Sequence, residues 1–302
     1  MKSLIFSHES SPKFFEQLSK RLGGEVGGLV SHVFPDGESY IRINNKCVNR
    51  DAIIISDLHK PNPKILPLIF LCETLRELGV KSILLVCPYL PYMRQDIQFQ
   101  SGECVTSRFF AKLLSQYIDT LITIDPHLHR YKSLDQIYSL ESTVLHANPY
   151  VASWIKTNIS KPLIIGPDSE SEQWAASAAN IISCPYIILK KERKGDKDVL
   201  ISPPDARQYN DLTPVLIDDI ISTGLTMIKT AEALKLEGFQ PAVCIGVHAV
   251  FSGNAYSEMK NSYISKIITC NTVPHETNQI DLTALLTEEI KSNNTTYRER
   301  YV

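Results

Sequence analysis

Short runs of apolar, largely β-branched residues alternate with longer amphipathic stretches along most of this chain. The first apolar runs lie at 52–57, 82–87 and 121–124, and the stretches between them repeat large apolar residues at the 3–4 spacing of a helix face. Strands that are apolar throughout and alternate with helices are typical of parallel sheets covered on both faces. The alternation therefore predicts an α/β protein.

The same rhythm occurs in both halves of the chain. We expect helices at 67–78, with Gly79 at its end, and at 107–118, with Phe109 among the inward-facing residues of the latter. In the second half, apolar runs at 163–165, 186–189, 215–217, 242–250 and 267–269 alternate with expected helices at 171–182 and 226–237.

A chain of 302 residues is long enough for two domains that each bury a core. We expect two related α/β domains, residues 1–147 and 148–302, each with a central parallel sheet flanked by helices. Only the polar stretch 292–296 is expected to be loosely ordered.

Charge and composition exclude several protein classes. Lysine and arginine total 31 against 33 acidic residues, a net charge of −2, which argues against a strongly basic nucleic-acid binder. No apolar run approaches the roughly 18 residues of a membrane span, and the apolar stretch near Met1 is too short for a signal peptide. The seven cysteines are scattered without a C-x-x-C pair. We expect a cytoplasmic protein with reduced cysteines.

The strongest chemical signal lies at 215–226. An apolar strand ends in Asp218 and Asp219, and a turn rich in hydroxyl groups, with one glycine, leads directly into a helix. Backbone N–H groups at such a helix start bind phosphate, whereas paired carboxylates suit sugar hydroxyls or Mg²⁺. A helix cap explains Ser222 or Thr223, but it does not explain two acids at the end of a buried strand.

With six further segments, this stretch resembles the ribose-phosphate pyrophosphokinase (PRPP synthetase) family, whose domains have the phosphoribosyltransferase fold. The segments occur in the family's order and the resemblance spans about residues 4–290. They are FPDGE at 34–38, PYLPYMRQD at 88–96, DPH at 125–127, GPD at 166–168, KKER at 190–193 and HAVFSGNA at 248–255. The resemblance implies transfer of the diphosphoryl group of ATP to the 1-hydroxyl of ribose 5-phosphate, giving PRPP and AMP, with magnesium.

The resemblance implies an ATP site in the first half of the chain. An aromatic ring stacks on adenine, acidic groups accept from its amine, and a guanidinium clamps phosphates. Without the resemblance, the P-D-G sequence would indicate only a turn. The implied ATP-binding residues are Phe34, Asp36, Gly37, Glu38, Arg94, Gln95 and Asp96. The family further implies that Phe34, Asp36 and Glu38 act from a neighbouring subunit, so we expect a homo-oligomer of at least two subunits.

The resemblance also implies that His127 and Asp168 bind Mg²⁺. Residue chemistry alone favours His127 as a hydrogen-bond donor, because Mg²⁺ prefers oxygen ligands. His129 is expected to be a bystander.

The charged run at 190–198 allows two interpretations. It is either a solvated loop or a mobile catalytic loop that places positive charge on the transferred phosphates. The family's Lys-x-Arg pattern falls on Lys191 and Arg193, with Lys190 as an alternative. The implied ribose 5-phosphate-binding residues are Arg193, Asp218, Asp219, Ser222, Thr223, Gly224, Leu225 and Thr226.

Three departures from the family pattern qualify these expectations. Leu225 stands where the family usually has a glycine, so we expect either a narrowed sugar-phosphate site or a shifted turn, because leucine would be strained at a positive φ. Glu170 and Glu172 follow Asp168 where glycines are usual. The segment 97–103 lacks basic residues and resembles the archaeal type, so regulation by ADP and phosphate is not expected.

Two alternatives remain open. A phosphoribosyltransferase that consumes PRPP would share the loop at 218–226 but would not need Arg94, Gln95 and Asp96 or a second domain. A catalytically silent regulatory subunit is motivated by Leu225 and by the acidic residues after Asp168.

Overall fold

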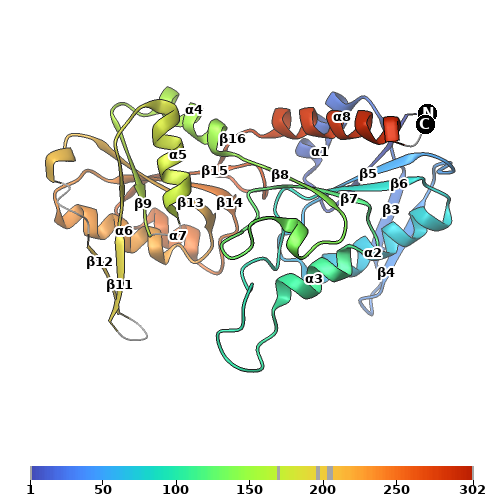
Figure 1. The fold of residues 1–302 in the computed structure, drawn as a ribbon, viewed down its shortest axis with the longest axis horizontal. Coiled ribbons are helices and arrows are strands. Elements are labelled where there is room, and N and C mark those ends of the chain that lie inside the picture. Colours follow the sequence, from blue (N-terminus) through green and yellow to red (C-terminus); the bar gives the residue numbers. More distant parts are fainter. Residues whose placement is uncertain (1, 169–170, 195–197, 203–206, 301–302) are drawn as a thin grey trace. The chain divides into compact units, whose positions relative to one another are not determined.

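The computed structural model describes residues 2–168, 171–194, 198–202 and 207–300, and the chain divides into two compact units (Figure 1). The first unit contains Met1–Leu145 and Thr283–Val302, and the second contains His146–Leu282. Each unit has its own cluster of buried apolar side chains. The predicted change of domain at 147/148 lies close to the observed division at 145/146.

The first unit is built on a six-stranded sheet in the order β2-β1-β5-β6-β7-β8, and every neighbouring pair is parallel. Its elements in chain order are β1 (Leu4–His8), α1 (Pro12–Leu22), β2 (Glu25–Val26), β3 (Leu29–Val33), β4 (Ser39–Ile43), β5 (Asp51–Ser56), α2 (Asn62–Glu77), β6 (Ser82–Val86), α3 (Thr106–Leu114), β7 (Thr120–Ile124), η1 (Leu134–Gln136), β8 (Glu141–Leu145) and α8 (Thr283–Arg300).

The second unit has a six-stranded parallel sheet in the order β10-β9-β13-β14-β15-β16. Its elements are α4 (Asn148–Asn158), β9 (Pro162–Gly166), α5 (Glu172–Ile182), β10 (Tyr186–Ile188), β11 (Lys190–Lys194), β12 (Asp198–Ser202), η3 (Arg207–Tyr209), β13 (Thr213–Ile221), α6 (Leu225–Leu236), β14 (Ala242–Ala249), α7 (Ala255–Lys260), β15 (Ile264–Cys270) and β16 (Asn278–Ile280).

The two sheets have the same topology. In each unit the second strand of the chain lies at the sheet edge beside the first, and the strand that follows the hairpin pairs on the other side of the first. Each unit also carries an antiparallel hairpin at the same point in its chain order, β3–β4 in the first and β11–β12 in the second. The predicted α/β class, with two related domains and central parallel sheets, is confirmed.

The assignment of the C-terminal residues differs from the prediction. The expected second domain ran to residue 302, but α8 belongs to the first unit and packs against α1 (Figure 1). Leu286 and Ile290 are fully buried, so α8 contributes an apolar face to the core of that unit. Helix α8 continues to Arg300 and so includes residues 292–296. The expectation of loose order in that stretch stays a prediction.

Two helices in the first unit differ from the predicted ones. Helix α2 begins at Asn62 and contains Pro67, which was expected to be its first residue. A proline inside a helix removes one backbone hydrogen bond, and the buried stripe through Leu68, Leu71 and Leu75 offsets that loss. In α3, Phe110 is buried, whereas Phe109 is 64% exposed, so the inward orientation expected for Phe109 is wrong. Within the described part of the chain, no helix has the length and apolarity needed to cross a membrane.

Candidate active site

Acidic side chains gather at the carboxyl edge of the second unit's sheet. Strands β9 and β13 are paired neighbours, with Leu216 opposite Ile165, so Asp168 and Asp218 follow the same edge. Strand β13 continues through Asp218 and Asp219 to Ile221, so the two acids lie in the strand's last residues rather than after it. The Asp219 N–H donates to Asp218 Oδ1 at 3.0 Å. Ligand sites of open parallel sheets lie at this edge.

The acids interact strongly with one another. Burial, followed by the nearby carboxylates of Asp219 and Asp168, raises the pKa of Asp218 well above its ordinary value. Like charges in a buried setting disfavour the ionised form. A divalent cation or a set of sugar hydroxyls would relieve this repulsion. The three carboxylates therefore form a site suited to such a ligand.

The turn after β13 leads directly into α6. Gly224 is the cap residue and has the left-handed φ of 70°, and Leu225 is the first helical residue. Thr223 is exposed, and Ser222 and Thr226 are partly buried. The N–H groups at the start of α6 have no carbonyl partner within the helix, which makes this turn suitable for an anion.

The structure shows a shifted turn at Leu225, which is one of the two outcomes expected from the sequence. Gly224 takes the positive φ, whereas Leu225 is not among the described residues with positive φ. The Leu225 side chain is 52% exposed. The left-handed residue falls one position before the one that the family comparison suggested, so Leu225 does not strain the backbone of the turn.

A second turn follows β9. The Ser171 N–H donates to Asp168 Oδ1 at 3.2 Å, and the Ser171 hydroxyl donates to the Asp168 carbonyl at 2.7 Å. These bonds position the start of α5. Glu172 is exposed in the first turn of α5, whereas Ser169 and Glu170 lie outside the described residues.

Lys191 and Arg193 lie in strand β11 of the antiparallel hairpin, opposite Ile201 and Val199 of β12. The expectation of a loop at 190–198 is therefore wrong for 190–194 and for Asp198. The missed signal is the run Val199–Ile201, whose residue types favour a strand, after Gly195 and Asp196, whose residue types are frequent in turns.

In the first unit, the tip of the β3–β4 hairpin carries aromatic and acidic groups. The rings of His32 and Tyr40 stack with centroids 4.5 Å apart, and the rings of Phe34 and His32 are nearly perpendicular, with centroids 5.0 Å apart. The turn is closed by hydrogen bonds from the Phe34 N–H to the Glu38 carbonyl, at 2.7 Å, and from the Glu38 N–H to Asp36 Oδ1, at 3.1 Å. Phe34 is 43% exposed, and Asp36 and Glu38 are exposed.

Sequence reasoning missed His32 and Tyr40. They are paired positions of the two hairpin strands, so their side chains lie on one face together. The sequence signal is the equal spacing of two aromatic-type residues on either side of a P-D-G turn. The hairpin thus presents a cluster of three rings rather than a single phenylalanine.

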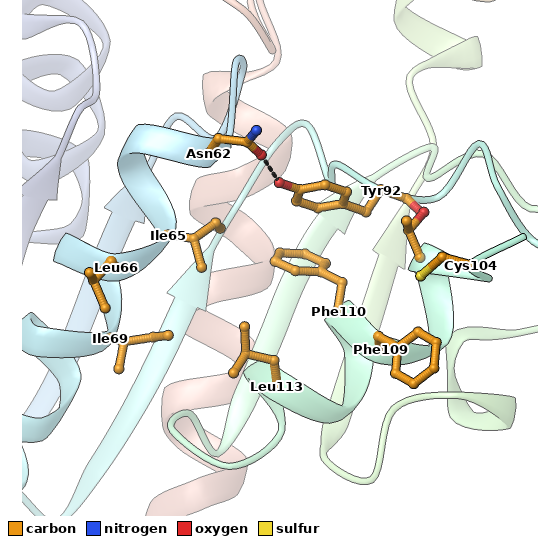
Figure 2. Close-up of a pocket in the computed structure, with 10 residues that line it drawn as sticks. Asn62, Ile65, Leu66, Ile69, Tyr92, Cys104, Phe109, Phe110 and Leu113 are labelled. Atoms are coloured by element: carbon orange, nitrogen blue, oxygen red, sulfur yellow. Dashed lines mark hydrogen bonds between the residues drawn. The ribbon is translucent and has the colours of Figure 1, made fainter.

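The segment that carries Arg94 and Gln95 is anchored through Tyr92. Tyr92 has a positive φ of 63°, its hydroxyl donates to Asn62 Oδ1, and its ring centroid lies 4.9 Å from that of Phe110. Figure 2 shows Tyr92 above an apolar cavity of about 470 Å³, with walls formed by side chains of α2 and α3. Tyr92 therefore fixes the chain two residues before Arg94.

Asp96 is buried rather than open to solvent. Its side chain is 2% exposed, and its Oδ1 accepts from Arg130 Nη1 at 2.7 Å. The Asp96 carbonyl accepts from the Tyr131 hydroxyl at 3.1 Å. Arg94 is exposed and Gln95 partly buried. Within this segment, Asp96 holds the backbone, and Arg94 and Gln95 are the residues accessible from solvent.

His127 follows β7 and contacts a second histidine. His127 Nδ1 and His129 Nε2 are 3.0 Å apart, and both residues are partly buried. Asp125, just before them, has a positive φ of 35°. The His129 ring is thus a direct hydrogen-bond partner of His127, whereas its expected role as a bystander stays a prediction. The i, i+2 spacing of the two histidines in Asp125–His129 was the available signal.

Comparison with known proteins agrees with these features. Residues 3–117 match the family model for the N-terminal domain of ribose phosphate pyrophosphokinase, and residues 133–284 match the phosphoribosyl transferase domain. The chain is 32% identical over 272 residues to a ribose-phosphate pyrophosphokinase of Sulfolobus acidocaldarius, covering 88% of this chain and 92% of the relative. A Pyrococcus abyssi protein of the same name is 30% identical over 280 residues, covering 92% and 95%.

The fold has a counterpart among solved structures. Phosphoribosylpyrophosphate synthetase from Mycobacterium smegmatis superposes with a TM-score of 0.86, covering 98% of this chain and all of that one. At 20% sequence identity, this similarity supports the two-domain fold.

Proposed function

The chain belongs to the ribose-phosphate pyrophosphokinase family, and on that basis we propose how its residues carry out the family's reaction. The reaction transfers the diphosphoryl group of ATP to the 1-hydroxyl of ribose 5-phosphate. The hydroxyl oxygen bonds to the β-phosphorus, and the bond from that phosphorus to the oxygen bridging to the α-phosphate breaks. AMP leaves with the bridging oxygen, and the hydroxyl loses its proton. The products are PRPP and AMP.

The second unit would hold ribose 5-phosphate. The 5-phosphate would bind the N–H groups and hydroxyls of Ser222, Thr223, Gly224, Leu225 and Thr226, at the start of α6. Asp218 and Asp219, at the end of β13, would accept hydrogen bonds from the ribose hydroxyls. Burial and the nearby carboxylates of Asp219 and Asp168 raise the pKa of Asp218, and hydrogen bonds from the ribose hydroxyls would stabilise its charged form.

The first unit would hold ATP. Adenine would stack on Phe34, with Asp36, Gly37 and Glu38 at the hairpin turn accepting from its amine, and Arg94 and Gln95 would bind the phosphates. Asp96 would act through its ion pair with Arg130, by fixing the chain that presents Arg94. We further propose that the hairpin serves the ATP site of a second copy in a homo-oligomer. The 43% exposed side chain of Phe34 supports this proposal.

Magnesium fits the chemistry of the carboxylate group in the second unit. Oxygen ligands suit Mg²⁺. Burial and, after it, repulsion from Asp219 and Asp168 raise the pKa of Asp218, and a cation near Asp168 would offset that repulsion. Asp168 and His127 are the proposed ligands. When bound, Mg²⁺ neutralises charge on the ATP phosphates.

Lys191 and Arg193 are the proposed catalytic residues. Diphosphoryl transfer is accelerated mainly by positive charge placed where phosphate charge develops. Both residues lie in β11, two positions apart, and pair with β12 in one short hairpin. Arg193 would also contact the sugar phosphate.

The observation that carries this proposal is the coincidence of both family domains with the acid and phosphate-loop geometry at 218–226. The test is an assay of the purified chain with ATP, ribose 5-phosphate and Mg²⁺, with AMP and PRPP separated by chromatography. Equimolar AMP and PRPP support the enzyme. No product identifies a silent subunit, and consumption of PRPP with a nucleobase instead identifies a phosphoribosyltransferase.

A further inference from the structure

The backbone that follows β14 is bonded to the turn that follows β13. The Phe251 N–H donates to the Ile221 carbonyl at 2.9 Å, and the Ser252 N–H donates to the Ser222 carbonyl at 3.0 Å. The parallel pairing of β13 with β14 stops at Ile221 and Ala249. These two hydrogen bonds therefore extend the attachment past the strand ends and onto the first residue of the sugar-phosphate turn, residues 222–226.

Phe251 makes these bonds from an unfavourable backbone conformation. Its φ is +22°, in a region that non-glycine residues rarely adopt. Such conformations cost free energy and persist only where surrounding contacts enforce them. Contacts with other residues must therefore hold the Phe251 backbone in this conformation.

That support is a cluster of three rings, Phe251, Tyr256 and His275, which we name the aromatic brace. The Phe251 ring centroid lies 4.5 Å from that of His275 and 5.4 Å from that of Tyr256, and the latter two are 4.8 Å apart. His275 is fixed in turn, since its N–H donates to Asn278 Oδ1 at 2.9 Å and its Nδ1 accepts from the Thr277 N–H at 3.3 Å. The brace thus connects the β15–β16 turn to Phe251.

The segment after Phe251 also supports the glycine of the sugar-phosphate turn. A Cβ atom at Gly224 would lie 2.8 Å from Met259 Cγ and Sδ, and Met259 of α7 is fully buried. Close packing on Gly224 keeps the start of α6 in one position. The turn is therefore held at Ser222 through hydrogen bonds and at Gly224 through packing, in both cases by residues 251–259.

We propose that the aromatic brace positions the sugar-phosphate turn and that Phe251 is a positioning residue for ribose 5-phosphate. The inference rests on the proposed function of this turn. Removing the Phe251 ring frees residues 251–252 and, through them, the Ser222 carbonyl. Because several N–H groups must point at one phosphate, a small shift of the turn weakens binding of the sugar phosphate more than binding of ATP.

The test compares four variants by steady-state kinetics and by calorimetric titration with ribose 5-phosphate. Phe251→Ala and Phe251→Gly both remove the ring, but glycine adopts a positive φ without strain. Phe251→Tyr keeps the ring. Tyr186→Ala removes a 42% exposed tyrosine of the same unit as a matched control. Trp154 and Trp174, the chain's two tryptophans, both lie in the second unit, so their fluorescence verifies that each variant is folded.

Phe251→Ala and Phe251→Gly are both expected to raise KM and Kd for ribose 5-phosphate by about 10-fold or more, with KM for ATP changed less than about 2-fold. Phe251→Tyr and Tyr186→Ala should stay near the unmodified protein. If Phe251→Gly binds ribose 5-phosphate normally whereas Phe251→Ala does not, the backbone conformation at residue 251 determines binding and the aromatic brace does not. That result overturns the proposal. Equal effects on both substrates, or none, overturn it as well.

Failure of the proposed function is a separate result. If the unmodified chain forms no PRPP but binds ribose 5-phosphate, the calorimetric comparison still decides on the brace. If a folded, unmodified chain does not bind ribose 5-phosphate, both the sugar-phosphate site and the brace proposal fall. Should Phe251→Ala not fold, Tyr256→Ala, which removes a partly exposed ring of the same cluster, takes its place with the same expected substrate asymmetry.

Discussion

His129 Nε2 lies 3.0 Å from Nδ1 of His127, and the two ring planes meet at 75°. The contact sets the orientation of the His127 ring, because one edge of it faces His129 and Nε2 is directed away. A histidine that binds a metal through one nitrogen commonly has the other held by a hydrogen-bonding neighbour. His129 thus has the position of a residue that orients a proposed Mg²⁺ ligand.

We expect His129→Phe to weaken binding of the metal–nucleotide complex by about 10-fold or more, the usual effect of losing such an orienting partner. Mn²⁺ serves as the probe, and binding of Mn²⁺–ATP is followed by electron paramagnetic resonance as well as by activity. His127→Phe is the reference for complete loss of the ligand. Unchanged Mn²⁺–ATP binding in His129→Phe would show that His129 has no part in metal binding, as expected from the sequence.

Lys191→Ala and Arg193→Ala should each lower kcat by about 100-fold or more and leave KM for ATP nearly unchanged, because both charges are proposed to act on the transition state. Lys194→Ala, at the end of the same strand, is the matched control and should retain most activity. A larger loss in Lys190→Ala than in Lys191→Ala would move the catalytic lysine by one position. Near-normal turnover in both principal variants contradicts a catalytic hairpin.

Leu225→Gly should change ribose 5-phosphate binding by less than about 2-fold, since Gly224 already supplies the left-handed residue and Leu225 lies at a helix start. The free energy of unfolding should fall by no more than about 1 kcal/mol, the cost of glycine within a helix. Calorimetry and denaturant unfolding measure the two quantities. A gain of more than about 10-fold in affinity would show that the leucine obstructs the phosphate site.

The stability of the first unit should fall as the pH is lowered below 6.5. Burial and the charge of Lys64 lower the pKa of His8 from 6.5 to about 4, and His8 Nδ1 lies 2.8 Å from Ser56 Oγ. The unfolded chain takes up this proton at higher pH than the folded one, so stability is complete above pH 6.5 and declines towards pH 4. The full loss amounts to about 3 kcal/mol.

Circular dichroism melts of His8→Asn and of the unmodified chain at pH 7.0 and pH 5.0 test this expectation. The variant should show a smaller difference in Tm between the two pH values, because asparagine does not titrate in this range. Equal pH dependence in the two proteins would assign the effect to other groups.

Much of the site's second-unit half could be predicted from a short window of sequence. The residues 215–226 contain the apolar strand, the paired acids, the hydroxyl-rich turn and the helix start, all within one strand–turn–helix unit. Each of these features is formed by residues that are adjacent in the chain, so a local sequence pattern is enough to predict it. The parallel sheets and the two-domain division were predictable for the same reason, since each follows from the repeated strand–helix alternation.

The hairpin β11–β12 could not be predicted from local sequence patterns. The run 190–198, with eight charged residues in nine, indicated a loop, but pairing with β12, including Val199 and Ile201, makes 190–194 a strand. Strand formation here is decided by the partner rather than by the charged segment itself, because β propensity depends on cross-strand contacts.

The sequence by itself determined the α/β class, the alternation of the main-sheet strands with helices and the residue types in the turn at 222–226. Only the tertiary structure decided that α8 joins the first unit and that Asp96 is buried against Arg130. The same holds for the contact of Phe251 with His275 and for the hydrogen bond from Ser252 to the Ser222 carbonyl. Each of these depends on contacts between residues far apart in the chain. Which distant residues come into contact depends on how the surfaces pack once the sheets have formed, so a local sequence pattern cannot predict these contacts.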